Sequence, residues 1–517
     1  MEQRGGGAVY NGTRLLRRST VYAAAFCALT TVATVAADDQ LQWGRQYSRN
    51  MTSEERGLPE TFDPATGKNI KWSAPLGTQS HGSPVVARGR VLVGTNNGHP
   101  RDPRQTGDRG VLMCFDQAGG ELLWQLVVPK LENDPYADWP DIGITSPPTV
   151  EGDRAYLVSN RGEALCLDLA GMADGNQGPY LDEGRHMARD DAAPTDVGER
   201  DADIIWLYDM RAEVGARPHD AANCSILVDG PFLYVCTSNG VDDTHKRVAA
   251  PDAPSVIVLD KATGRLVGRD GAGIGPRIIH SLWSSLSLGE VKGRTLVFFG
   301  GGDGVCYAFE ALKAAPPNDR PVELRTVWRF DCDPSAPKDN PLQYQDNRRE
   351  GASNISGMPV FHKNRVYVAA GGDVWHGKRQ AWLKCIDATK TGEITTGGEV
   401  WSAPLERHCI STPAVRDDLV YIADCGGQVR CLDADTGQPY WTHEMSGEIW
   451  ASTLVADGKV YVGSRRGDFC ILAAGKEKRA LASVDLGSPM DATPAAAGGT
   501  LYIVTMSRLY AVQEDQR

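Results

Sequence analysis

The chain has 517 residues, of which 41% are hydrophobic, 57 are glycine and 30 are proline. This length allows several domains or one large repeat architecture, and short β-rich runs between Gly and Asp turns predict an all-β fold. The formal net charge is −12. An acidic surface repels phosphate backbones, so we expect no nucleic-acid partner.

The N-terminus has the pattern of an export signal. Basic residues at Arg14, Arg17 and Arg18 precede an apolar run from Val21 to Ala37, which ends in small residues. This order predicts a cleaved signal peptide and a periplasmic or secreted protein. An uncleaved anchor is the alternative, although the run is short for a membrane span and rich in Ala and Thr.

The domain boundaries follow from this signal. We expect a signal peptide over residues 1–37, an N-terminal extension over residues 38–68 and a repeat domain over residues 69–517. After cleavage we expect no membrane span. The Arg17-Arg18 pair leaves both the general secretory route and twin-arginine export open.

A unit of four short strands recurs along the mature chain. The clearest copy runs from Ile410 to Trp441, and its strands, named A to D in chain order, lie near residues 411–415, 419–423, 427–433 and 440–441. Polar turns separate the strands, and Gly437 supplies the positive φ of the turn between C and D. Tandem units of this kind are typical of a β-propeller.

Eight such units can be counted. They begin at Ser83, Ser146, Cys224, Trp283, Ser356, Ser411, Ala451 and Ala492. The last unit has three strands, and the missing outer strand can come from Asn69 to Trp72, which pairs both open edges of the array. We predict a single eight-bladed β-propeller of four-stranded antiparallel blades, closed by an N-terminal strand and monomeric. Seven blades with frayed ends are the alternative.

The turn between C and D carries a family pattern. The run Cys431 to Trp441 fits Ala/Cys-x-Asp-x-x-Thr-Gly-x-x-x-Trp throughout, and Cys114 to Trp124 fits it with Gly119-Gly120 in place of Thr-Gly. The chain thus resembles the pyrroloquinoline-quinone (PQQ)-like, quinoprotein-alcohol-dehydrogenase-like propeller repeats. The stretch from Trp43 to Trp72, followed by Val93 to Gly98, also resembles exported planctomycete-type members of that group. The resemblance implies a fold in which the Trp packs between blades, and it says little about function.

The cysteines divide into two sets. Six of the twelve occupy the repeat position, Cys27 belongs to the predicted signal, and the five others leave any disulfide pairing open. The six are Cys114, Cys166, Cys306, Cys385, Cys431 and Cys470.

A candidate site follows from the ring. Strand A lines the channel, and the D-to-A connections share one face with the B-to-C loops, which are long at residues 96–109, 238–254 and 371–380. We expect residues next to strand A to converge at the channel mouth as a ligand site: His81, Thr145, His219, Asn223, His280, Trp283, Asn354, Arg407, His408, Glu448, Trp450 and Asp491. A water-filled mouth lined by polar residues is the alternative.

The tips of the B-to-C loops add residues such as Asp373 and Arg465. The insertion over residues 172–202, between strands C and D of blade two, is expected on the opposite face.

Three functions fit these features. The first is a binding or scaffold protein whose channel face holds a small molecule or another protein. The second, implied by the resemblance, is a PQQ-dependent dehydrogenase of alcohols or sugars, for which Glu448, Asp491, Asn354, Arg407, Trp283 and Trp450 are the candidate residues. The adjacent Cys-Cys pair and the C-x-x-C-H motif of such enzymes do not occur in the sequence. The third is a hydrolase or lyase acting on polysaccharide, with histidines as acid and base.

The residues themselves predict no catalytic group, no metal ligands and no cofactor. The resemblance makes PQQ with Ca²⁺ the cofactor to test. We favour the binding protein, because the packing pattern is clear and no catalytic motif accompanies it.

Overall fold

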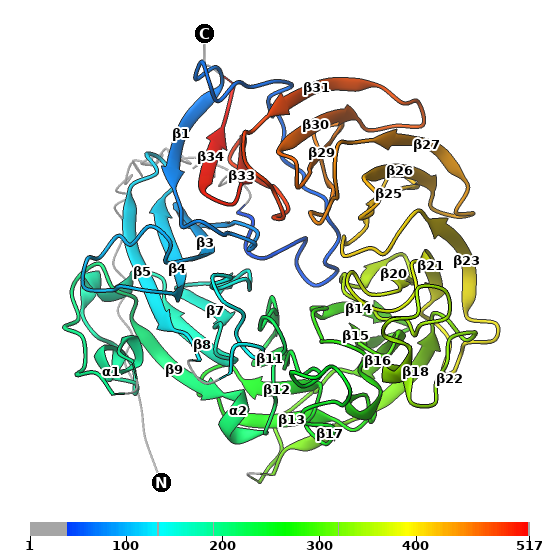
Figure 1. Ribbon diagram of the computed structural model, residues 1–517, viewed down its shortest axis with the longest axis horizontal. Coiled ribbons are helices and arrows are strands. Elements are labelled where there is room, and N and C mark those ends of the chain that lie inside the picture. The colour runs from blue at the N-terminus through cyan, green and yellow to red at the C-terminus, as the bar shows by residue number, and fades with distance from the viewer. Residues whose placement is uncertain (1–38, 132–133, 190, 319, 515–517) are drawn as a thin grey trace, which may run out of the picture. The chain divides into compact units, whose positions relative to one another are not determined.

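The computed structural model describes residues 39–131, 134–189, 191–318 and 320–514. The predicted signal peptide lies outside these residues. The described chain forms eight small sheets arranged in a ring around a central axis (Figure 1). This confirms the all-β propeller and the count of eight blades rather than seven.

Five blades have the four predicted strands in A–B–C–D order, all antiparallel. Blade one has β2 (Val85–Ala87), β3 (Arg90–Asn96), β4 (Arg109–Asp116) and β5 (Leu122–Pro129), and blade two has β6 (Thr149–Glu151), β7 (Arg154–Val158), β8 (Glu163–Asp168) and β9 (Ile204–Asp209). Blade five has β19 (Val360–His362), β20 (Arg365–Gly371), β21 (Ala381–Asp387) and β23 (Glu399–Leu405), and blade six has β24 (Ala414–Arg416), β25 (Leu419–Ala423), β26 (Gln428–Asp433) and β27 (Pro439–Glu444). Blade seven has β28 (Leu454–Ala456), β29 (Lys459–Gly463), β30 (Asp468–Ala473) and β31 (Ala480–Asp485).

Blades three and four each carry a fifth strand that the repeat pattern does not predict. Blade three has β10 (Leu227–Asp229), β11 (Phe232–Cys236), β12 (Val256–Asp260), β13 (Leu266–Asp270) and an outer β17 (Val322–Leu324). Blade four has β14 (Ser287–Val291), β15 (Arg294–Gly300), β16 (Val305–Glu310), β18 (Thr326–Asp331) and an outer β22 (Gly392–Glu393). Both extra strands pair in parallel with strand D and come from the loop of the following blade, so they cover an exposed sheet edge.

Blade eight is built from both ends of the described chain. Its strands are β32 (Ala495–Ala497), β33 (Thr500–Val504), β34 (Arg508–Val512) and the N-terminal β1 (Ile70–Pro75). β1 pairs antiparallel with β34, as the blue and red strands of Figure 1 show. The predicted closure of the ring is therefore present.

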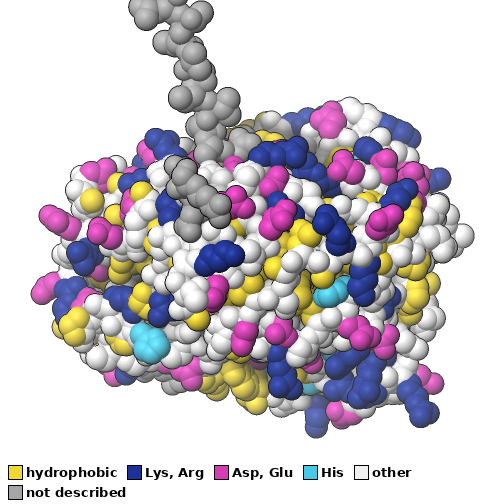
Figure 2. Space-filling view, turned by 90° about the horizontal axis from the view of Figure 1, so that it is seen from above, with side chains coloured by type: hydrophobic (Ala, Val, Ile, Leu, Met, Phe, Trp, Pro, Cys, Tyr) yellow, Lys and Arg dark blue, Asp and Glu magenta, His cyan; other side chains and the backbone are white. Residues whose placement is uncertain are grey.

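Helices are few and short among the described residues. They are η1 (Gly171–Asp174), α1 (Glu183–Met187), α2 (Met210–Glu213), η2 (Gly275–Arg277) and η3 (Pro341–Tyr344). Within the described ranges, none is long and apolar enough to span a bilayer. The side view in Figure 2 shows basic side chains lying beside acidic ones over most of that face.

The outer-strand tryptophans join neighbouring blades. The indole of Trp124 donates to Leu169 O, that of Trp328 to Ala388 O and that of Trp441 to Gly475 O, and each acceptor belongs to the following blade. Gly437 has a φ of 72°, and a Cβ there would lie 2.5 Å from the Trp401 ring, so glycine serves both the turn and the packing. The eleven described cysteines are all free and buried.

The segment over residues 39–56 crosses the centre of the ring, the region between the inner strands that we call the channel (Figure 1). It hydrogen-bonds to the inner strands of successive blades: Val86 N donates to Gln40 O, Val150 N to Leu41 O, Leu288 N to Tyr47 O, Phe361 N to Ser48 O, Val415 N to Asn50 Oδ1 and Val455 N to Met51 O. These oxygens of the segment accept from N–H groups of strand A in each of these blades, toward the end where strand A turns into strand B. The segment therefore lies across the channel at the face opposite the long loops.

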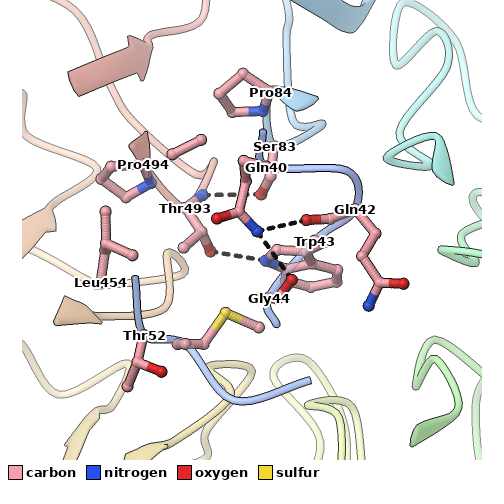
Figure 3. Close-up of a pocket in the computed structure, with 12 residues that line it drawn as sticks. Gln40, Gln42, Trp43, Gly44, Thr52, Ser83, Pro84, Leu454, Thr493 and Pro494 are labelled. Carbon is pink, nitrogen blue, oxygen red and sulfur yellow. Dashed lines mark hydrogen bonds between the residues drawn. The ribbon is translucent and has the colours of Figure 1, made fainter. Parts of the chain in front are cut away.

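Little space remains around this segment. Figure 3 shows Trp43 beside blade eight, where its indole donates to Thr493 Oγ1 at 3.1 Å. The pocket lined by Trp43, Ser83 and Leu454 leaves about 10 Å³ for water, room for about one molecule.

The insertion over residues 172–202 corrects one expectation. We predicted it on the face opposite the long loops, but its far end contacts the B-to-C loop of blade one. Arg104 Nη1 donates to Asp196 O at 2.8 Å, and Gln105 Nε2 to Thr195 Oγ1 at 3.4 Å. The insertion is long enough to pass the outer strands and reach the long-loop face.

Candidate functional site

Four histidines meet at the channel mouth, and we call them the histidine cluster: His219, His245, His280 and His376. Their ring centroids lie 4.6 Å apart for His219 and His245, and 4.9 Å apart for His219 and His280. His376 lies 4.9 Å from both His245 and His280. Sequence predicts two of the four, whereas His245 and His376 lie within the long B-to-C loops of blades three and five.

The B-to-C loop of blade five is held by its own side chains. Asp373 Oδ1 accepts from the backbone N–H groups of Trp375 and His376 at 2.9 and 3.1 Å, which fixes the turn that presents both rings. Lys378 forms a buried ion pair with Asp333 of the preceding D-to-A connection. The loop is therefore positioned by contacts on both of its arms.

Two carboxylates serve the histidine cluster. His280 lies 3.2 Å from Asp373 through Nδ1 and 3.5 Å from Asp220 through Nε2. Burial opposes the charged form, but these carboxylates raise the pKa of His280, and His280 holds the pKa of Asp373 well below its usual range despite burial. Burial, then the neighbouring imidazoles, lowers the pKa of His219 to about 3.

A second group, the Trp450 group, lies across the mouth and contains Trp450, Arg465, Asp491 and His81. The Arg465 guanidinium lies 3.8 Å from the Trp450 ring centroid, a cation–π contact. Arg465 Nε is 3.1 Å from Asp491 Oδ1, and His81 Nδ1 is 2.9 Å from Asp491 Oδ2. These residues come from the D-to-A connections and the B-to-C loops of blades seven, eight and one.

Trp375 joins the two groups. Its ring lies 5.5 Å from His280, 5.7 Å from Trp283 and 5.6 Å from Trp450, each contact edge to face. Its side chain is exposed at 43%. An aromatic surface thus runs across the mouth, and the sequence prediction includes Trp283 and Trp450 but not Trp375.

The remaining predicted residues have mixed placements. Arg407 and Glu448 form an ion pair at 3.7 Å, and Glu448 accepts from the Trp450 indole. Asn354 Nδ2 donates to Asp373 Oδ2 at 2.8 Å, beside the histidine cluster. Thr145 Oγ1 instead donates to Ala222 O, which ties two blades together, and the backbone N–H of Asn223 donates to Ser238 Oγ. We assign no ligand contact to these last two.

His408 provides a prediction on pH. It is buried, its Nε2 has no hydrogen-bond partner, and burial and Arg407 lower its pKa to about 4. The unfolded chain takes up this proton near pH 6.5 and the folded chain only near pH 4, so acid favours unfolding between these values. The wild type should therefore lose about 1–2 kcal/mol relative to His408→Leu between pH 7 and pH 5.

Urea unfolding of both proteins at the two pH values measures this difference. Arg407→Leu keeps the imidazole but removes a cation that lowers its pKa, so this variant should lose less stability than the wild type between the two pH values. An equal offset between wild type and His408→Leu at both pH values would show that His408 does not titrate on unfolding.

Comparisons with known proteins agree with the fold. A family model, PQQ_2, described as outer membrane protein assembly factor BamB, matches residues 60–310, 325–448 and 379–516. No curated protein matches the sequence.

Among solved structures, the quinohemoprotein alcohol dehydrogenase from Comamonas testosteroni is 12% identical, with a TM-score of 0.57 over 93% of this chain and 81% of that one. A europium-containing methanol dehydrogenase is 13% identical, with a TM-score of 0.57 over 92% and 97%. BamB from Moraxella catarrhalis is 14% identical, with a TM-score of 0.49 over 87% and 98%. At these identities the likeness concerns the fold alone.

Proposed function

This chain belongs to the family described as outer membrane protein assembly factor BamB, and from that premise we propose that it is an exported binding protein whose channel mouth holds a small polar ligand. One observation carries the proposal: the segment over residues 39–56 lies across one end of the channel, while aromatic and charged side chains converge at the other. This arrangement supports a blind funnel rather than a through-channel.

The chemistry of the funnel indicates the kind of ligand. Trp375 and Trp450 offer apolar ring surface, and Arg465 and His81 offer hydrogen-bond donors beside it. Sites that combine aromatic surface with a few polar groups are typical of small-molecule binding. A protein partner at the same face is the alternative, because Trp375 is exposed.

PQQ with Ca²⁺ is the cofactor of the alternative function, and the residues present do not fit it. Ca²⁺ takes about six to eight oxygen ligands, whereas nitrogen donors engage the carboxylates here. Asp373 is held by His280 and Asn354, and Asp491 by His81 and Arg465. Arg465 also lies over the Trp450 ring, where a planar cofactor would stack.

Native mass spectrometry of protein purified from the export compartment tests the binding function. The wild type should carry a small molecule, and Trp450→Leu should lose it because the ring surface and its stacked guanidinium are removed. Tyr440→Leu, an exposed aromatic on the outer strand β27, should keep the bound mass. Protein that carries no small molecule but captures a folded protein through Trp375 would contradict the proposal.

A second measurement separates the alternative. Protein incubated with PQQ and Ca²⁺ is desalted, and its quinone absorbance and dye reduction with alcohols or sugars are followed. We expect neither. Retained chromophore with turnover would favour the dehydrogenase.

A further inference from the structure

We propose that His219, His245, His280 and Asp220 form a binding site for a divalent transition metal of the zinc class. One nitrogen from each of the three histidines lies within 4.8 Å of the others. The residues come from three separate segments of blades three and four: two D-to-A connections and one B-to-C loop. The inference goes beyond the proposed function and does not depend on which ligand the funnel holds.

The hydrogen bonds around two of the rings select the ligand atom. His219 Nδ1 lies 2.8 Å from Val241 O, which accepts only, so Nδ1 carries the proton and Nε2 has a free lone pair. His280 Nδ1 lies 3.2 Å from Asp373 Oδ2, which orients that ring in the same way. A carbonyl or carboxylate behind the imidazole is the usual support of a metal-binding histidine.

The separations of the free atoms suit a small tetrahedral ion. Bonds of about 2.0–2.1 Å place neighbouring ligand atoms roughly 3.4 Å apart. His219 Nε2 lies 3.0 Å from His245 Nε2 and 3.6 Å from Asp220 Oδ1, and His280 Nε2 lies 3.5 Å from Asp220 Oδ2. Two imidazole nitrogens 3.0 Å apart repel each other unless a proton or a cation lies between them.

Charge favours the cation. Asp220 at the site and Asp373 behind His280 together supply two negative charges, which balance one divalent ion.

The donor set also indicates the metal class. Three imidazoles and one carboxylate suit zinc and neighbouring transition metals, and they do not suit calcium or magnesium. His376 is not one of the three histidines whose ligand nitrogens lie within 4.8 Å of one another, although its ring centroid lies 4.9 Å from those of His245 and His280. It borders the site on the side of the blade-five loop.

Metal binding is tested on the full mature protein without any organic ligand. After incubation with Zn²⁺ and dialysis at pH 7.5, elemental analysis should find one Zn²⁺ per chain. Substitution with Co²⁺ should give the intense visible bands of a tetrahedral site. A failure of the small-molecule experiment would leave both readouts unchanged, so the two proposals fail separately.

Variants assign the ligands. His245→Gln, on a half-buried loop residue, should weaken Zn²⁺ binding at least about 100-fold, and Asp373→Asn, which reaches the proposed ligands through His280, should weaken it about 10–100-fold. His81→Gln, an imidazole across the same mouth, should bind as the wild type does. Thermal unfolding of the metal-free proteins checks that each variant is folded.

Should His245→Gln not fold, Asp220→Asn replaces it, since this carboxylate is partly exposed. The proposal is overturned if dialysed wild type retains no stoichiometric Zn²⁺ or shows no tetrahedral Co²⁺ bands. It is equally overturned if the folded ligand variant binds Zn²⁺ as tightly as His81→Gln.

Discussion

Replacing Arg49 by methionine should destabilise the protein by about 3–5 kcal/mol. Arg49 is fully buried, and its guanidinium donates to Ser225 O, Ile226 O and Leu286 O from inside the channel. Hydrogen bonds from a charged donor contribute about 1.5–3 kcal/mol each, and their loss also leaves buried carbonyls without that donor. Methionine retains the apolar stem but is shorter than arginine, so the loss combines the missing hydrogen bonds with a small cavity where the guanidinium lay.

Arg45→Met is the matched control on the same segment. Arg45 pairs with Glu54, and both side chains are nearly half exposed. Such a surface pair contributes about 0–1 kcal/mol, so this variant should unfold almost as the wild type does. Urea unfolding gives both free energies. If the two variants were equally stable, the segment could not be anchored by Arg49.

The same substitution should also open the funnel. Arg49 is the point at which the segment over residues 39–56 contacts blades three and four most extensively. Once this contact is lost, trypsin should cut native Arg49→Met at Arg45 or Arg56. Cleavage at Arg56 should be faster than in native Arg45→Met, which has no cleavage site at residue 45. Unchanged cleavage would show that the backbone bonds to the inner strands hold the segment without Arg49.

The repeat pattern allowed the ring to be predicted because it is set by short-range rules. Each unit ends in a Trp or an equivalent strand, and the last unit lacks an outer strand that the run up to Trp72 can supply. Ring closure follows because an unpaired edge is costly. The fifth strands β17 and β22 escaped prediction, since each consists of two or three residues of a loop that pairs only after the sheet exists.

The site could be predicted only where it adjoins a strand. His219 and His280 precede strand A of their blades, so equivalence between repeats places them at the mouth. His245 and His376 lie inside long loops whose paths depend on tertiary contacts such as Lys378 with Asp333. The unusual length of those two loops was the only feature of the sequence that pointed to a functional role for them.

The channel segment had no sequence signal. It forms isolated bridges rather than a strand, and its geometry is set mainly by backbone N–H groups of the inner strands, which donate to its carbonyls. Arginine is usually exposed, so Arg49 read from sequence would be placed on the surface. Its burial becomes intelligible only when the polar lining of the channel is known.

Truncating Trp328 to alanine should cost about 3–5 kcal/mol, because the cavity left between two blades cannot collapse while both sheets stay in place. The side chain is fully buried at the interface of blades four and five, and its indole donates to Ala388 O at 3.2 Å. Trp375→Ala removes the same ring from the exposed channel mouth, so its cost should stay below about 1 kcal/mol. Native mass spectrometry should show the reverse order for ligand binding. Trp375→Ala should lose the bound molecule, and folded Trp328→Ala should keep it. If Trp375→Ala were the less stable protein, its ring would serve packing, and the aromatic surface proposed for the ligand would have to be assigned to the core.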